Sequence, residues 1–298
     1  MDVAVTGSSG LIGTALVDAL GAAGHRALRV VRGAATGDAI GWDPKAGTID
    51  ASGLDGVDAV VHLAGAGIGD RRWNDAYKRE LVDSRVLGTG LIARTVAGLA
   101  RPPGVLVSAS AVGWYGDRGD EVLDETSAPG TGFLADLCQQ WEAAAEPART
   151  AGIRVAHTRS GVVLSPRGGA LKKELPLFKL GLGGRFGTGR QWQSWITLDD
   201  EVSALVYLLT ANVGGPVNLT APTPVTNAEM TKTLGTVLHR PTVFPVPAFG
   251  PKLLLGPELA AVLLYEGQRV LPRALEASGF TFAHPTLEGA LGSMLGHP

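Results

Sequence analysis

Three glycines near the start of the chain have the spacing of a phosphate-binding turn. They are Gly7, Gly10 and Gly13 in the run TGSSGLIG, which follows a short apolar stretch and opens a helical pattern. In such a turn the first glycine allows a tight bend, the second lets the backbone approach a pyrophosphate, and the third lets the helix pack closely on the sheet. Free N–H groups and the positive end of the helix dipole favour an anion there. A glycine-rich turn without a ligand is the alternative.

The end of the second expected strand indicates which dinucleotide would bind. Proteins that bind NAD usually place Asp or Glu there, where the carboxylate binds the ribose 2′-hydroxyl. This chain has Arg32 and no acid, and an arginine can pair with the 2′-phosphate of NADP. The sequence predicts NADP(H) as the cofactor, unless Arg32 is only a solvated side chain at a strand end. The contacts of the turn itself are expected from Gly7, Ser9, Gly10, Leu11, Ile12 and Gly13.

Short apolar runs alternate with helical patterns through the first half of the chain. We expect strands at 3–5, 27–31, 59–63, 105–108 and 155–158, and long helices at 76–100 and 133–151. Strands that alternate with crossover helices form a parallel sheet covered on both faces. The predicted fold class is α/β, a Rossmann-like doubly wound parallel sheet with a smaller, partly discontinuous substrate-binding portion.

The composition changes after about residue 165, where glycines, tryptophans and then prolines interrupt the chain. We expect an NADP-binding domain at 1–165, to which later segments return, a substrate-binding portion at 166–250 and a C-terminal helical extension at 251–298. The run from Thr197 to Glu201 is typical of a helix N-terminus, where acids complement the helix dipole. We therefore interpret its three acids as part of a cap rather than as a catalytic cluster.

The bulk composition excludes several classes of partner. The chain has 298 residues, 45% of them hydrophobic and 18% charged, with a formal net charge of -2. No basic stripe favours nucleic acid or a membrane surface, and no apolar stretch reaches the roughly 18 residues that span a bilayer. The six histidines lack metal-ligand spacing, and the single cysteine, Cys138, has no disulfide partner in the chain. We expect a cytoplasmic monomer or homodimer that binds a small-molecule substrate and no metal.

Motifs along nearly the whole chain resemble the extended short-chain dehydrogenase/reductase superfamily. More specifically, the chain is similar to the epimerase-like atypical branch, sometimes labelled cell-division-inhibitor-like, which carries an added C-terminal domain of unknown function. The motifs that carry the resemblance are TGSSGLIG, VVHLAGAGI, SRVLGT, SASAVGWYG, LCQQWEAAA, RSGVVLSPRGGAL, SWITLDDEV and QRVLPRALEASGFTFAHPTLEGAL.

The resemblance implies hydride transfer at a nicotinamide, with a Ser/Tyr/Lys set that handles the proton. Ser110 matches the serine of that set. When the WE dipeptide of LCQQWEAAA anchors the alignment, Leu134 stands at the tyrosine position and Cys138 at the lysine position. Tyr115 is then either a displaced acid or an aromatic that only packs the cofactor pocket. Otherwise Ser110 works with water or a substrate group, or the protein binds the cofactor without turning it over.

The resemblance also implies contacts elsewhere. Further cofactor contacts are expected from Leu63, Ala64, Gly65, Arg85, Ser108, Arg159 and Gly161. A lid or wall at 181–195 would contact a polar or anionic, ring-bearing substrate through Arg185, Arg190, Gln191 and Trp195. Two function classes remain: an NADP(H)-dependent oxidoreductase or epimerase-like enzyme with an altered proton-transfer group, and a non-catalytic NADP(H)-binding sensor or scaffold.

Overall fold

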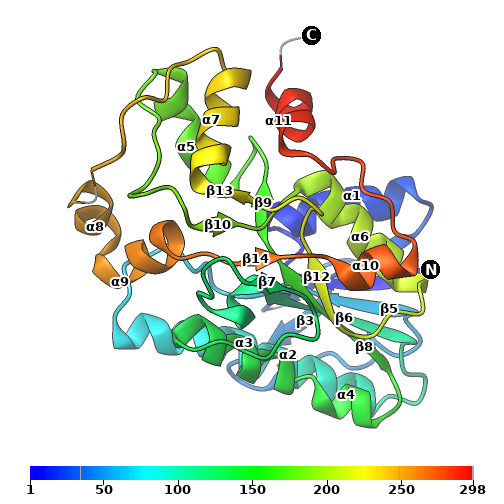
Figure 1. Ribbon diagram of the computed structural model, residues 1–298. Coiled ribbons are helices and arrows are strands. Elements are labelled where there is room, and N and C mark those ends of the chain that lie inside the picture. Colours follow the sequence, from blue (N-terminus) through cyan, green and yellow to red (C-terminus); the bar gives the residue numbers. More distant parts are fainter. Residues whose placement is uncertain (34, 248, 297–298) are drawn as a thin grey trace.

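The centre of the molecule is an eight-stranded sheet with the strand order β12-β8-β6-β5-β1-β2-β3-β4 (Figure 1). The computed structural model describes residues 1–33, 35–247 and 249–296. Neighbouring strands are parallel except for β3 and β4 at one edge. The strands are β1 (Asp2–Thr6), β2 (Arg26–Arg32), β3 (Ile40–Asp43), β4 (Thr48–Ile49), β5 (Ala59–His62), β6 (Val105–Ala111), β8 (Arg154–Ser160) and β12 (Gly215–Leu219).

Helices cover both faces of this sheet, as Figure 1 shows. Successive side chains of β1 point to opposite faces, so Val3 and Val5 pack in one core and Ala4 packs in the other. The first core includes α1 (Leu11–Ala22) and α6 (Leu198–Thr210). The second includes α2 (Asp75–Ala97) and α4 (Glu146–Thr150), beside α3 (Phe133–Ala143). The predicted Rossmann-like α/β class is confirmed.

The helix expected at 133–151 is two helices, α3 and α4. Pro147 lies in the first turn of α4 and has no N–H to donate to the preceding turn. The two helices therefore meet at a break beside Ala144 and Ala145. The cap expected before α6 is confirmed, because the Thr197 hydroxyl accepts a hydrogen bond from the Asp200 N–H at 3.0 Å.

A smaller layer comes from the second half of the chain. Its apolar cluster joins Leu171, Phe178, Trp195, Leu234 and Leu291. The elements around this cluster are α5 (Gly169–Lys179), α7 (Asn227–Val237), α11 (Leu287–Leu295), β9 (Val162–Leu164), β11 (Trp195–Thr197), β10 (Trp192–Gln193) and β13 (Val225–Thr226). Because α6 and β12 return to the main sheet, the chain crosses between the two layers more than once.

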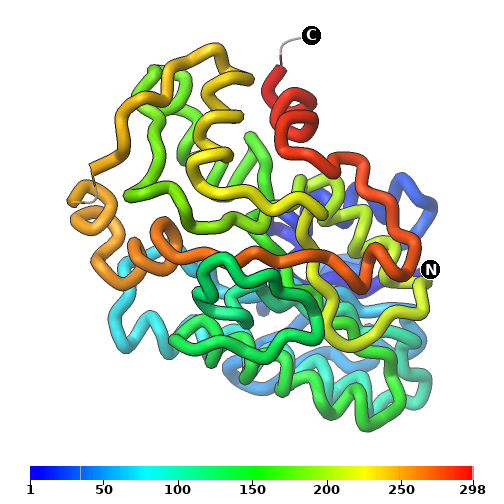
Figure 2. The backbone as a smooth tube through the Cα atoms, viewed as in Figure 1, coloured from blue at the N-terminus to red at the C-terminus, as the bar shows by residue number. Residues whose placement is uncertain are grey.

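The last part of the chain crosses back over the molecule (Figure 2). It forms α8 (Phe249–Leu255), α9 (Pro257–Ala260) and a wide turn at Ala261–Tyr265. β14 (Arg269–Val270) then pairs with β7 (Val122–Leu123), and α10 (Arg273–Ser278) follows. Within the helical extension expected at 251–298, α9 is thus a short helix that widens into this turn. Within the described residues, no helix is both long and apolar enough to cross a membrane.

Candidate cofactor and substrate site

The glycine turn joins β1 to α1 so closely that side chains would not fit. Gly7 has φ +65°, and a Cβ placed on it would lie 2.9 Å from the carbonyl carbon of Leu63. A Cβ on Gly13 would lie 2.2 Å from the carbonyl oxygen of Gly7. The Gly10 N–H donates to that same oxygen at 3.0 Å, which closes the turn.

The first turn of α1 leaves N–H groups free for an anion. Gly10 is the N-cap residue and brings no side chain to cap the helix, and the first turn holds no acid. The first helical hydrogen bond runs from the Thr14 N–H to the Gly10 carbonyl oxygen at 2.9 Å. The N–H groups of Leu11, Ile12 and Gly13 precede it and have no acceptor within the helix. This donor set fits the pyrophosphate of a dinucleotide.

Two arginines lie on β2, the strand that pairs with β1 beside this turn. Arg32 ends the strand and is exposed, and no hydrogen bond or ion pair holds its guanidinium among the described residues. Arg29 lies on the same strand and donates from Nη1 to the Ser8 carbonyl oxygen at 2.9 Å. Ser8 is buried, whereas Ser9 is exposed beside it. The sequence did not identify Arg29 as a site residue, because it lies inside the strand rather than at its end.

Hydrogen bonds to Thr6 hold the loop that follows β5. The Thr6 hydroxyl accepts from the N–H groups of Leu63 and Ala64 at 3.0 and 3.2 Å, and it lies 2.8 Å from His62 Nδ1. His62 is fully buried, and burial lowers its pKa to about 4, so its ring is neutral. A Cβ on the adjacent Gly65 would lie 3.3 Å from the guanidinium carbon of Arg85, a tight contact that requires a small shift of the Arg85 side chain.

A cavity of about 240 Å³ lies where β6 and β8 end. Its wall includes Ala111 and Ser160, the last residues of those two strands. Other lining residues come from α2, α3, the loop at 191–194 and the C-terminal segment. Among these lining residues are Arg85, Leu134, Cys138, Trp141, Gly161, Val162, Gln191, Gln193, Leu263, Glu266 and Gln268.

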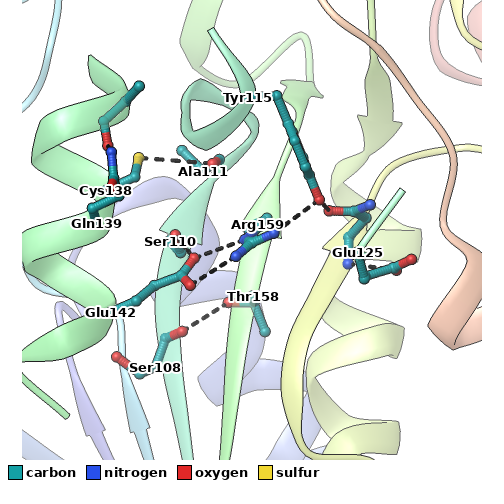
Figure 3. A network of polar contacts seen from close by, with 12 residues as sticks. Ser108, Ser110, Ala111, Tyr115, Glu125, Cys138, Gln139, Glu142, Thr158 and Arg159 are labelled. Atoms are coloured by element: carbon teal, nitrogen blue, oxygen red, sulfur yellow. Dashed lines mark hydrogen bonds and ion pairs between the residues drawn. The ribbon is translucent and has the colours of Figure 1, made fainter. Parts of the chain in front are cut away.

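Leu134 and Cys138, at the positions that the resemblance gives to tyrosine and lysine, both line this cavity. The Cys138 thiol donates to the Ala111 carbonyl oxygen at 3.7 Å (Figure 3). Burial raises the pKa of Cys138 to about 12, so it stays a neutral thiol. The two positions therefore supply an apolar side chain and an unreactive sulfur.

Ser110 belongs to a buried network that Figure 3 shows. Its hydroxyl donates to Glu142 Oε1 at 2.7 Å. Arg159 donates from Nε to Oε1 and from Nη2 to Oε2 of the same carboxylate, at 2.8 and 2.9 Å. The side chains of Arg159 and Glu142 are only 3% and 9% exposed. The Ser110 proton is thus directed away from the cavity, toward an ion pair.

Tyr115 lies at the other end of this network. Its side chain is fully buried, its hydroxyl donates to Asn218 Oδ1 at 2.6 Å, and it accepts from Arg159 Nη1 at 3.0 Å. Burial outweighs the nearby guanidinium and raises the pKa of Tyr115 to about 12. Tyr115, Ser110, Ser108 and Arg159 are not part of the cavity wall. Tyr115 therefore packs in the interior, apart from this cavity.

The expected substrate wall is only partly at the cavity. Gln191 lines it, and its amide nitrogen donates to the Phe186 and Leu264 carbonyl oxygens. Trp195 does not, because it is fully buried in the apolar cluster of the smaller layer and its indole N–H donates to the Thr223 carbonyl oxygen. The structure therefore gives Trp195 no contact with this cavity. Arg185 and Arg190 are exposed and lie outside the wall.

Two carboxyl groups lie near the cavity, where the sequence did not place them. Glu266 lines it, and burial, with a smaller effect of Asp117, raises the pKa of Glu266. Glu201, fully buried in α6, accepts from the Ser160 hydroxyl at 2.6 Å. Glu266 belongs to a C-terminal segment that no local pattern connects to β6 and β8. From the sequence, Glu201 is interpreted as one of the acids that cap α6. Among the described residues, no cluster of side chains could hold a metal ion.

Known proteins resemble this chain along its whole length. Residues 3–220 match the NAD dependent epimerase/dehydratase family, and residues 246–294 match a domain of unknown function, DUF1731. An epimerase family protein of Mycobacterium tuberculosis is 50% identical over 294 residues, which are 97% of this chain and 96% of the relative. The crystal structure of human epimerase family protein SDR39U1 with NADPH has a TM-score of 0.90 and 38% identity, and the match covers 99% of both chains. A nucleoside-diphosphate sugar epimerase from Corynebacterium glutamicum has a TM-score of 0.80 and 41% identity, over 99% of this chain and 58% of that one.

Proposed function

Because the chain belongs to the NAD dependent epimerase/dehydratase family, we propose that it is an NADP(H)-dependent oxidoreductase or epimerase-like enzyme for a small polar substrate. Its membership confirms the resemblance predicted from the motifs. The observation that carries the proposal is the meeting of two features at one edge of the sheet. These are the free N–H groups of the glycine turn and a largely apolar cavity whose wall carries a few polar side chains, among them Arg85, Gln193 and Glu266. Ligands of open α/β sheets bind at this edge.

The glycine turn would hold the cofactor pyrophosphate, and Arg32 the 2′-phosphate. The expectation of NADP(H) agrees with the NADPH in the crystal structure of the human relative. The backbone from Leu63 to Gly65 would lie against the cofactor riboses, and Gly161 would lie near the nicotinamide. When bound, this cofactor supplies or accepts a hydride. The chain itself must orient the substrate, exclude water and handle one proton.

Glu266 is our candidate for the proton-handling group in place of a tyrosine and lysine pair. Its carboxyl lines the cavity, and its raised pKa favours the protonated form needed to donate. A second function is favoured by a specific observation. The hydroxyls of Ser110 and Tyr115 are both directed to buried acceptors, as expected of a cofactor-binding sensor that does no chemistry.

Oxidation of NADPH across a panel of aldehydes and ketones tests the proposal. We expect turnover with at least one of them, and we expect Glu266→Gln to lower kcat while NADPH affinity stays unchanged. Glu288→Gln is the matched control, because Glu288 is an exposed glutamate of α11 that does not line the cavity. Tight NADPH binding without turnover of any carbonyl compound would contradict the proposal that the protein is an enzyme, and would favour the cofactor-binding sensor.

A further inference from the structure

Arg85 presents an unneutralised cation to the cavity. Its side chain, on α2, is 7% exposed and lines the cavity wall. Nη1 donates to the Leu81 carbonyl oxygen at 3.2 Å, whereas Nε is buried without a hydrogen-bond partner among the described residues. The guanidinium carbon lies 4.9 Å from the centre of the Trp141 ring, so an aromatic face covers one side of it.

Arg159 is another buried arginine of this protein, and it binds a carboxylate with the same atoms. Its Nε and Nη2 bind both oxygens of Glu142. No ion pair involving Arg85 exists among the described residues, and no hydrogen bond there involves its Nη2. Burial lowers the pKa of Arg85, and within the described part of the chain the groups that oppose this effect are Cys138 and Tyr77 rather than a carboxylate. A buried charge without a partner is costly, so its retention at a cavity points to an anion supplied by a ligand.

A second lining atom also has no partner. Gln193 Oε1 is buried and accepts no hydrogen bond from the described residues. Neighbouring atoms cover both Gln193 Oε1 and Arg85 Nε, so a ligand reaches them only after a small side-chain shift. Arg85 Nη2 makes no hydrogen bond with any described residue and is not covered in this way, so it can donate directly to an anion. Trp141, Leu134 and Val162 supply apolar surface between such groups.

We propose that Arg85 binds the carboxylate of the substrate through its guanidinium, with Nη2 as the open donor, and that the substrate is a small oxo- or hydroxy-carboxylic acid. This inference rests on the proposed function, because it assigns the cavity to the substrate of that reaction. It also moves Arg85 from the cofactor, where the sequence placed it, to the substrate. The pyrophosphate would have its own donors at the N-terminus of α1.

Calorimetric titration with mandelate and benzoate, each against its amide, tests the carboxylate site. The titrations use NADPH-loaded and NADPH-free protein, wild type and Arg85→Gln. We expect an acid to bind wild type, its amide to bind more weakly, and Arg85→Gln to lose about ten- to a hundredfold of the affinity for the acid. Arg85→Lys should recover only part of it, because an ammonium cannot reproduce the planar fork.

The stability of the ligand-free protein gives an independent measurement. Arg85→Gln removes an unpaired buried charge, so its thermal midpoint should equal or exceed that of wild type. Arg159→Gln is the matched control. It leaves the buried Glu142 carboxylate without its counter-charge, so it should lower the thermal midpoint. A lower midpoint for Arg85→Gln would overturn the inference, since a structural arginine would behave in that way.

The two proposals fail in different ways. If NADPH does not bind wild type, the proposed function fails, and the titration of NADPH-free protein still decides the carboxylate site. If NADPH affinity falls about tenfold in Arg85→Gln and no acid prefers wild type, Arg85 serves the cofactor. That result overturns the inference and leaves the proposed function standing.

Discussion

Glu142 and Arg159 hold together the side chains around the end of β6. The pair is buried, it is bidentate, and it also orients the hydroxyls of Ser110 and Tyr115. Glu142→Gln would leave the guanidinium without a counter-charge inside the protein. We expect a loss of about 3–5 kcal/mol in the free energy of unfolding, measured by urea denaturation.

The Arg149–Glu146 pair of α4 serves as the control. It is also bidentate, but it is exposed to solvent. Exposed pairs contribute little to stability, so Arg149→Gln should unfold at nearly the same urea concentration as wild type. A Glu142→Gln protein as stable as Arg149→Gln would show that the buried pair does not have the role described.

Glu201 predicts a pH dependence of stability. Burial raises its pKa to about 7, and its Oε2 has no partner among the described residues. An unfolded chain releases this proton near pH 4.3, so between about pH 4 and 7 the folded state binds more protons. Stability therefore falls as pH rises through this window. Glu201→Gln should exceed wild type at pH 8 by on the order of 3 kcal/mol, and this excess should vanish near pH 4. Urea denaturation at both pH values measures it, and an equal difference at both would contradict the raised pKa.

At the scale of elements, the β1–α1 unit depends on the absence of side chains. A Cβ on Gly13 would collide with the Gly7 carbonyl oxygen, whereas a Cβ on Gly21 of the same helix would meet nothing within 4 Å. We expect Gly13→Ala to displace α1 from the turn and to weaken NADPH binding at least about tenfold, a loss comparable to that of one charge-assisted contact. Nicotinamide fluorescence on titration measures the affinity.

Gly21→Ala is the matched substitution, since it adds the same methyl group to α1 at an open position. Alanine in a helix is favoured over glycine by about 0.5–1 kcal/mol, so this variant should be slightly more stable and should bind NADPH as wild type does. Equal NADPH affinity in the two variants would mean that close packing at Gly13 does not shape the site.

The strands and helices that build the first layer were predictable because their signals are local. Apolar runs marked β1, β2, β5, β6 and β8, and the glycine spacing marked the turn. The pairing of β14 with β7 joins segments about 150 residues apart, and two-residue strands have no periodicity to recognise. The break between α3 and α4 came from Pro147, whose effect a helical periodicity of apolar residues does not register.

At the scale of the whole molecule, the C-terminal segment completes the cavity. The Ser194 hydroxyl accepts from the Val270 N–H at 2.9 Å and donates to the Gln268 carbonyl oxygen at 2.8 Å. Asn218 of β12 donates to the Leu271 carbonyl oxygen at 3.0 Å. These bonds fix Glu266 and Gln268 against the sheet edge. No sequence pattern within either segment predicts the contact, because it depends on how the whole chain is folded.

The same dependence explains which site residues the sequence could indicate. The family resemblance pointed to Ser110, Tyr115 and Trp195, but each of these side chains is bonded to an interior partner that only the folded chain brings to it. Arg85 is of interest for the opposite reason, since the fold buries it and brings no partner. The backbone turn was easier to predict, because its chemistry lies in consecutive N–H groups and glycines.

The most direct measurement is a fluorescence titration of wild type, Arg32→Ala and Arg26→Ala with NADPH and NADH. Arg26 is the control, because it is an exposed arginine at the opposite end of β2, paired loosely with Asp2. We predict that wild type prefers NADPH by about ten- to a hundredfold, that Arg32→Ala loses this preference, and that Arg26→Ala keeps it. Binding of neither nucleotide, or equal binding of both by wild type, would contradict an NADP(H) site at this edge of the sheet.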